Sequence, residues 1–298
     1  MNKLLLTGAF KYSQKQLNIL ENLGYNIIFI QDEREKLTID VADIDAVVCN
    51  SLFLHNDINN FTSLKFIQLT SAGLDRVPLD YIYKNDIQLF SAKGVYSIPM
   101  AEWTVLKILE IYKKSHFFYE NQRLHKWEKQ RDLFELTGKT ASIIGYGEVG
   151  YEISKRLKAF DMNIISVARR KHENKYIDEA FLIDDIEKVL RKSDVVIFTL
   201  PLKDETKHIL NEDKMRIMKD NSIIVNVSRG GIIDETALVN FLKEDKFLGV
   251  ALDVFEKEPL SNSFLWEFEK VIITPHNSFV SDKVNERLFK LILSNITK

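Results

Sequence analysis

Four residues that can carry charge follow apolar runs in the second half of the chain: Arg229, Asp253, Glu258 and His276. The runs have the length and the β-branched content of buried strands. Because parallel strands end at a common edge of their sheet, we expect these side chains at or just past that edge. Together they offer a cation for a carboxylate, a histidine for proton transfer and a carboxylate to pair with the histidine. Taken singly, each also has a structural interpretation, such as a salt bridge.

The segment Gly145-Tyr146-Gly147-Glu148-Val149-Gly150, called the glycine loop below, has the glycine spacing of a dinucleotide-binding turn. The apolar run Ser142 to Ile144 precedes it, and apolar residues at helical spacing follow it. This context predicts a strand, a tight turn and a helix whose N-terminus faces a pyrophosphate. The alternative is a strand, turn and helix without a ligand.

Two further strand ends are expected beside the glycine loop. One run, Val195 to Thr199, leads into a proline that cannot continue a central strand. Another, Ser222 to Val227, leads into the small-residue loop that carries Arg229. In a doubly wound sheet such ends line the cofactor, so we predict cofactor contacts from Thr199, Leu200, Pro201, Val227 and Ser228.

The choice of cofactor depends on the residue that ends the next strand, Asn163 to Val167. An NAD site places Asp or Glu there, about 20 residues past the glycines, to accept from the ribose 2′-hydroxyl. This chain has Ala168, followed by Arg169, Arg170 and Lys171. With no carboxylate to repel a 2′-phosphate and two guanidinium groups to bind it, NADPH is predicted in preference to NADH. The alternative is a solvated basic turn.

Composition excludes several classes of protein. The chain has 298 residues, of which 45% are hydrophobic and 28% charged, as expected for two globular domains rather than a disordered chain. Lys plus Arg number 41 and Asp plus Glu number 43, so no surface for nucleic acid or an anionic membrane is indicated. We expect a small-molecule partner and no metal site.

The compartment is inferred from cysteine usage and from the apolar runs. Cys49 is the only cysteine, which is typical of a reducing compartment. The N-terminal apolar run, Leu4 to Leu6, is too short for a secretion signal. No stretch approaches the ~18 apolar residues of a membrane span. We therefore predict a cytoplasmic protein.

The first hundred residues alternate short apolar runs with polar helical stretches and contain no glycine-rich phosphate loop. This alternation predicts parallel βαβ units. We predict an α/β fold with two doubly wound parallel-sheet domains, a Rossmann-like cofactor domain (99–276) inserted in a flavodoxin-like substrate domain (1–98 and 277–298). Five runs of the substrate domain are predicted strands: Leu4 to Leu6, Ile27 to Ile30, Ala46 to Cys49, Phe66 to Leu69 and Ile87 to Phe90.

Two other segments indicate what the protein binds, one a small molecule and the other a second copy of the chain. Ala72 and Gly73 follow the fourth of these runs, and their small side chains leave two backbone amides open to a carboxylate, although an ordinary turn is the alternative. A long amphipathic helix is expected after Ser97, and the connector 113–137 beyond it is rich in aromatic residues. Because aromatic side chains are unusual on a solvated arm, we predict a homodimer through the helix and the connector.

In these motifs the chain resembles the D-isomer-specific 2-hydroxyacid dehydrogenase family over nearly its whole length. The matching segments are the glycine loop, Asn226 to Glu235, Ala251 to Pro259, and Pro275-His276. Ala168-Arg169-Arg170 is similar to the Ser-Arg or Gly-Arg variant of the family's NADPH-linked glyoxylate and hydroxypyruvate reductases. The family's more usual acidic residue at that place is missing.

The resemblance implies a role for each matching residue. His276 would be the acid/base, Glu258 its partner and Arg229 the substrate-binding arginine. Asp253 would contact the nicotinamide carboxamide, and the loop at Ala72 and Gly73 would bind the substrate carboxylate. These roles predict transfer of a hydride between NAD(P)H and a small 2-oxo acid, with protonated His276 as proton donor.

Two alternatives remain on the same fold. The family's transcriptional corepressors indicate that such a chain can be an NAD(P)H-sensing regulatory binding protein, although they too retain the three catalytic residues. A formate-type dehydrogenase is disfavoured, because that branch carries glutamine where this chain has Glu258.

Overall fold

The computed structural model describes residues 2–298, which form two compact units. One unit comprises residues up to Tyr96 together with Ser281–Lys298, and the other comprises Ser97–Val280. The second unit is therefore inserted in the sequence of the first. Contacts divide the chain after Tyr96 and Val280, whereas the boundaries expected for the functional domains were 98 and 276. Which unit binds substrate stays a prediction.

The first unit has a five-stranded parallel sheet in the order β2-β1-β3-β4-β5. This is the doubly wound order of flavodoxin-like folds. Each predicted run coincides with a strand to within a few residues. The strands are β1 (Asn2–Thr7), β2 (Tyr25–Ile30), β3 (Ala46–Cys49), β4 (Phe66–Leu69) and β5 (Gln88–Phe90).

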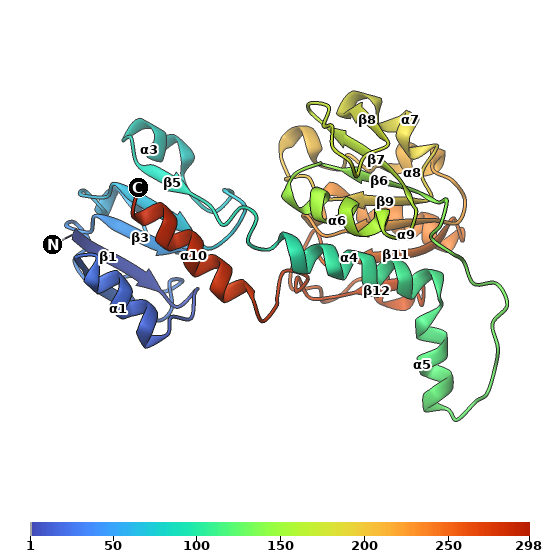
Figure 1. Ribbon diagram of the computed structural model, residues 1–298, viewed down its shortest axis with the longest axis horizontal. Coiled ribbons are helices and arrows are strands. Elements are labelled where there is room, and N and C mark those ends of the chain that lie inside the picture. Colours follow the sequence, from blue (N-terminus) through green and yellow to red (C-terminus); the bar gives the residue numbers. More distant parts are fainter. Residues whose placement is uncertain (1) are drawn as a thin grey trace. The chain divides into compact units, whose positions relative to one another are not determined.

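Helices cover both faces of this sheet (Figure 1). Leu4 and Leu6 face α1 (Gln14–Asn22) and α10 (Val284–Ile296), whereas Leu5 faces the opposite layer. Successive β1 side chains thus enter different cores, as the two-residue period of a strand requires. The opposite layer contains α2 (Leu52–His55), η1 (Ile58–Asn60) and α3 (Leu79–Lys84).

The second unit has a seven-stranded parallel sheet in the order β12-β11-β10-β9-β6-β7-β8. Counted from its first strand, this is the Rossmann order 3-2-1-4-5-6 with one further strand. The predicted fold class is therefore confirmed for both units. The strands are β6 (Thr140–Ile144), β7 (Asn163–Ala168), β8 (Glu179–Leu182), β9 (Val195–Phe198), β10 (Ser222–Asn226), β11 (Phe247–Leu252) and β12 (Val271–Ile273).

Two helical layers enclose this sheet as well (Figure 1). One layer has α4 (Ser97–Tyr112) packed beside α6 (Glu148–Lys158). The other layer has α7 (Ile186–Leu190), α8 (Glu212–Ile217) and α9 (Glu235–Lys243). Short 3₁₀ turns occur at η2 (Ile183–Asp185), η3 (Asp204–Thr206), η4 (Gly230–Ile232) and η5 (Phe264–Glu267).

After α4 the chain forms α5 (Ser115–Arg123) and a long irregular return to β6, which together extend away from the second unit's sheet (Figure 1). Tyr119 and Trp127 of this arm are 60% and 97% exposed.

No helix within residues 2–298 is long and apolar enough to cross a membrane. That same span holds no cluster of three His, Cys, Asp or Glu side chains able to bind a metal.

Candidate active site

The glycine loop lies where the strand order of the second unit reverses, between β6 and β9. Ligands of open α/β sheets bind outside the carboxyl ends of the strands at such a point. The carboxyl ends of β6 and β9 are joined there, because Thr199 N donates to Ile144 O at 2.9 Å and Thr199 Oγ1 donates to Gly145 O. The predicted residues of both segments thus lie side by side.

Gly145 is required by the backbone at this turn. Its φ is +96°, and a Cβ atom there would lie 2.5 Å from the Cα of Leu200. Since no L side chain fits that space, the close approach of the two strand ends depends on this glycine.

The start of α6 fits a pyrophosphate. Gly147 is its N-cap and provides no side-chain cap to the first-turn amides. A Cβ atom at Gly147 would have no protein atom within 4 Å, so the space in front of the helix is open. Uncapped N–H groups at the positive end of a helix bind anions. The residues present therefore suit the dinucleotide that the spacing predicted.

A chain of side-chain hydrogen bonds ties the glycine loop to the segment after β7. Asn174 Nδ2 donates to Tyr146 Oη at 3.0 Å, and Tyr146 Oη lies 2.7 Å from Ser154 Oγ. Because Ser154 Oγ donates to Tyr151 O at 2.9 Å, Tyr146 must donate to Ser154 and accept from Asn174. The buried Tyr146 hydroxyl thereby fixes the segment that carries the basic residues.

The segment after β7 exposes its three cationic side chains to solvent. Ala168 is partly buried at the end of β7, and Arg169, Arg170 and Lys171 are exposed. Within residues 2–298 the three cations make no ion pair with a protein carboxylate. Their charges remain available to an anionic ligand.

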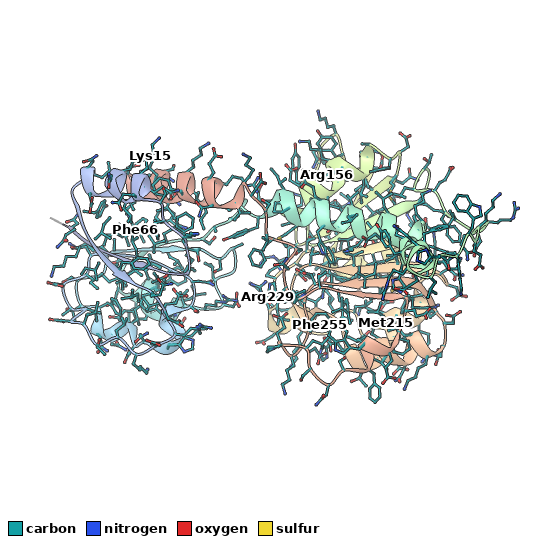
Figure 2. The ribbon with its side chains drawn as sticks, turned by 90° about the horizontal axis from the view of Figure 1, so that it is seen from below. Lys15, Phe66, Arg156, Met215, Arg229 and Phe255 are labelled. Atoms are coloured by element: carbon teal, nitrogen blue, oxygen red, sulfur yellow. The ribbon has the colours of Figure 1, made fainter. Side chains whose placement is uncertain are left out.

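Arg229 sits on a tightly bonded turn after β10. Asn226 Oδ1 accepts from the amide and the hydroxyl of Ser228 at 3.0 and 2.8 Å, and Asn226 Nδ2 donates to Arg229 O at 3.0 Å. Arg229 Nη1 donates to Ser228 O at 2.9 Å. A Cβ atom on Gly230 would lie 1.8 Å from the carbonyl carbon of Phe255, so this turn packs directly on the chain after β11 (Figure 2).

Asp253 is fully buried and organises the turn that carries His276. Its Oδ1 accepts from Thr274 Oγ1 at 2.5 Å and Asn277 N at 2.8 Å, and its Oδ2 accepts from Ser278 N at 2.9 Å. Its backbone oxygen accepts from His276 N at 2.8 Å. These contacts fix the turn after β12. They are a structural role that the sequence pattern did not predict.

His276 and Glu258 are brought together, as predicted for a paired histidine. Nδ1 of His276 lies 2.8 Å from Oε2 of Glu258, and Glu258 Oε1 accepts from Phe255 N at 3.1 Å. A carboxylate at Nδ1 places a proton on that nitrogen, so Nε2 is left to exchange a proton. The φ of His276 is +50°, a left-handed conformation held by the bonds of the turn.

More carboxyl groups lie close to this pair. Glu256 Oε1 is 2.9 Å from His208 Nε2, and Glu256 N donates to Glu235 Oε1 at 2.6 Å. Burial has the largest effect on the Glu235 carboxyl and raises its pKa, and the negative charges of Glu256 and Glu258 raise this pKa further. Glu235, Glu256 and Glu258 thus form a cluster of carboxyl groups beside His276.

The structure divides the predicted site residues between the units. Ala72 and Gly73 lie in the first unit, in the loop after β4, and Ser71 Oγ donates to Gly73 O at 3.0 Å. All the other predicted residues lie in the second unit, at the carboxyl ends of β6, β7, β9, β10, β11 and β12.

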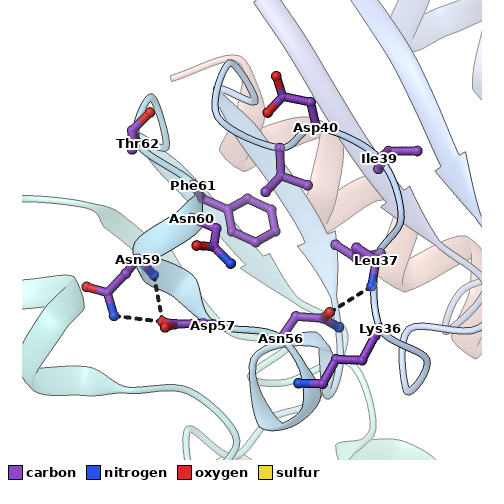
Figure 3. A pocket seen from close by; sticks show the side chains of 11 residues that line it. Lys36, Leu37, Ile39, Asp40, Asn56, Asp57, Asn59, Asn60, Phe61 and Thr62 are labelled. Carbon is purple, nitrogen blue, oxygen red and sulfur yellow. Dashed lines mark hydrogen bonds between the residues drawn. The ribbon is translucent and has the colours of Figure 1, made fainter.

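The hollow in Figure 3 belongs to the first unit and contains no predicted site residue. Its volume is about 520 Å³, and it lies between the segments 36–41 and 56–62. Two of its polar side chains already bond within the lining: Asp57 Oδ1 accepts from Asn59 N at 2.9 Å, and Asn56 Oδ1 accepts from Leu37 N at 2.9 Å (Figure 3). The bonds to Asn59 lower the pKa of Asp57.

Comparison with known proteins agrees with this geometry. A family model described as D-isomer specific 2-hydroxyacid dehydrogenase, NAD binding domain, matches residues 105–278. Most of the second unit is thus this family's NAD-binding domain, and the cofactor is a nicotinamide dinucleotide.

Curated relatives match most or all of this chain. The chain is 32% identical to a glyoxylate reductase of Thermofilum pendens, over 88% of this chain and 80% of that protein. It is 31% identical to a D-3-phosphoglycerate dehydrogenase of Methanocaldococcus jannaschii over 100% of this chain, which spans 57% of that protein.

Among solved structures, a protein of similar sequence has the same fold. The structure of a glyoxylate reductase from Paecilomyes thermophila has a TM-score of 0.88 and 26% identity, covering 99% of this chain and 94% of that one. As its motifs predicted, the chain belongs to the D-isomer specific 2-hydroxyacid dehydrogenase family.

Proposed function

We propose that the protein uses NAD(P)H to reduce a small 2-oxo acid of the glyoxylate or hydroxypyruvate type to its D-2-hydroxy acid. The observation that carries this proposal is the His276–Glu258 pair, with Nδ1 and Oε2 2.8 Å apart. It lies at the same carboxyl edge of the sheet as the glycine loop and Arg229. A proton donor, a cation and a dinucleotide turn on one edge are the groups that this reaction needs.

Each residue has a defined part in the proposed chemistry. The bound nicotinamide supplies the hydride. Arg229 binds the 2-oxo acid and polarises its carbonyl, and Nε2 of protonated His276 donates the proton to the carbonyl oxygen. Glu258 accepts from Nδ1 and keeps Nε2 as the donor. The carbonyl carbon gains the hydride and its oxygen gains the proton, which gives the hydroxyl group.

The remaining site residues bind substrate and cofactor. Backbone amides at Ala72 and Gly73 bind the substrate carboxylate. The glycine loop and the segments 199–201 and 227–228 hold the dinucleotide, and Asp253 adds a contact to the carboxamide. Arg169 and Arg170 are exposed and pair with no carboxylate of residues 2–298, and an alanine stands beside them in place of a carboxylate; these features support NADPH as the preferred cofactor.

The experiment that tests the function is a panel of 2-oxo acids assayed with NADPH and with NADH. We expect glyoxylate and hydroxypyruvate to be reduced and the products to have the D configuration. Turnover distinguishes an enzyme from an NAD(P)H-sensing binding protein, which would bind the cofactor and reduce none of the panel.

We also propose a cytoplasmic location, since the only cysteine, Cys49, is a free buried thiol.

We propose in addition that two copies associate through α4, α5 and the connector 113–137. Support comes from the exposed aromatic and apolar side chains of this arm: Phe118, Tyr119, Leu124, Trp127, Leu133 and Phe134. Such a set is large for a surface in contact with water.

Light scattering at micromolar concentration is expected to give twice the 34.7 kDa of one chain. Trp127→Ser should weaken the dimer. Trp266→Ser is the matched control, because Trp266 is also exposed, at 57%, but lies outside the arm. A monomeric wild type, or equal effects of the two substitutions, would contradict this mode of association.

A further inference from the structure

Arg76 is a partly buried cation whose partner is neutral. It follows the Ala72–Gly73 turn in the same loop, and its Nη1 donates to Asn50 Oδ1 at 2.9 Å. Among residues 2–298 no carboxylate forms an ion pair with it. A guanidinium has five N–H donors, and a partly desolvated charge without a counter-ion is costly to keep. The arginine therefore has both the capacity and an energetic reason to bind an anion.

The loop that carries Arg76 lies at the binding edge of the first unit. In the order β2-β1-β3-β4-β5 the strand sequence reverses between β1 and β3. Asn50 directly follows β3, and Arg76 is in the loop after the neighbouring β4. Ligands of such sheets bind outside these carboxyl ends.

A buried carboxylate holds Asn50 in position. Glu33 is 5% exposed and accepts from Thr7 Oγ1 at 2.7 Å, Asn50 N at 3.0 Å, and the amide and hydroxyl of Ser51 at 2.5 and 2.8 Å. Four neutral donors thus satisfy Glu33 without Arg76. Asn50, fixed through its backbone, is free to orient the guanidinium with its side chain.

We infer that Arg76 binds a second anionic group, a carboxylate or a phosphate, on the side chain of the 2-oxo acid. The inference rests on the proposed reductase function, in which Ala72 and Gly73 bind the carboxylate next to the carbonyl. Arg76 is three residues further along the same loop, and the inference assigns its guanidinium to the other end of a short substrate. The inference makes 2-oxo acids with an acidic side chain the preferred substrates, ahead of glyoxylate and hydroxypyruvate, which have no second anionic group.

Matched substrate pairs isolate the second anion. Oxaloacetate and 4-methyl-2-oxopentanoate share the branching of the side chain and differ in its charge. Phosphohydroxypyruvate and hydroxypyruvate differ by the phosphate. We expect the wild type to favour the charged member of at least one pair by ~10-fold or more in kcat/KM, as for one charge-assisted bond. The pair that shows the effect identifies carboxylate or phosphate.

Variants then test whether Arg76 is the origin of the preference. Arg76→Gln should abolish it and leave kcat/KM for glyoxylate, which has no side chain, within about twofold. Arg76→Lys should restore part of it, because the charge is kept without the fork of donors. Arg34→Gln is the matched control, since Arg34 is an exposed arginine of the same unit paired with Asp32 at 2.7 Å. It should keep the preference.

Failure of the inference and failure of the function are distinguishable. Glyoxylate turnover without any preference for an acidic side chain overturns the inference alone, as does an equal loss with all substrates in Arg76→Gln. If no 2-oxo acid is reduced, the proposed function fails. Calorimetric titration of the wild type with D-3-phosphoglycerate and with D-glycerate then tests the anion site at Arg76 by itself. Equal dissociation constants for the two ligands would overturn the inference.

Discussion

Replacing His276 with alanine is expected to lower kcat by ~10²–10⁴-fold, the range for loss of a general acid, while NADPH binding stays nearly intact. The reason is that Nε2 is the one ring nitrogen left to transfer a proton, since Nδ1 is bonded to Glu258 Oε2 at 2.8 Å. Stopped-flow single-turnover rates measure the chemical step, and fluorescence titration measures cofactor binding.

Two further variants exclude a purely structural cause. His276 has a φ of +50°, and asparagine tolerates that conformation better than alanine. His276→Asn should therefore keep the turn and still lose the proton transfer. His208→Asn is the matched control, because His208 also has a positive φ, +48°, and pairs with Glu256 at 2.9 Å. It should retain turnover. Near-wild-type rates in both His276 variants across neutral pH would show that the acid is another group.

Arg229→Ala differs from the histidine variants in its kinetic signature. The arginine is proposed to hold substrate and to polarise the carbonyl, so its loss should raise KM and lower kcat together. The histidine variants should lower kcat with little change in KM.

The sequence was informative where one residue type is dictated by the backbone. Gly145, with its φ of +96° and its contact with Leu200, and Gly230, against Phe255, tolerate no side chain. A glycine at each of these positions therefore indicates the turn geometry directly. Strand positions were predictable for a similar reason, because alternating side chains of buried parallel strands such as β1 must enter two apolar cores.

Side chains that act through other side chains were not predictable. Asn174, which bonds to Tyr146, lies in an irregular segment with no periodic pattern. Glu33 reads as one acidic residue of a charged run, and only the fold brings Thr7, Asn50 and Ser51 to its carboxylate. Its signal would have been its place just past β2, at the edge where ligands bind.

Exchanging Ala168 for Asp and Arg169 for Ala is expected to reverse the cofactor preference. A 2′-phosphate carries close to two negative charges, and a charge-assisted bond to Arg169 or Arg170 is worth ~1.5–3 kcal/mol. NADH forms no such bond and finds no carboxylate at Ala168, so the wild type should favour NADPH by at least ~10-fold in kcat/KM, about 1.4 kcal/mol. In the double variant Asp accepts from the 2′-hydroxyl and repels the phosphate.

The bonds from Asn174 through Tyr146 hold the Arg169–Lys171 segment beside the glycine loop, so the reversal depends on side-chain chemistry and not on moving the loop. The measurement is kcat/KM for NADPH and NADH on the wild type, both single variants and the double variant, with dissociation constants for both cofactors as a second readout. Lys175→Ala is the control, because it removes an exposed cation of the same segment whose ammonium lies over the Tyr176 ring. Equal use of both cofactors by the wild type, or an unchanged ratio in the double variant, would mean that Arg169 and Arg170 only face water.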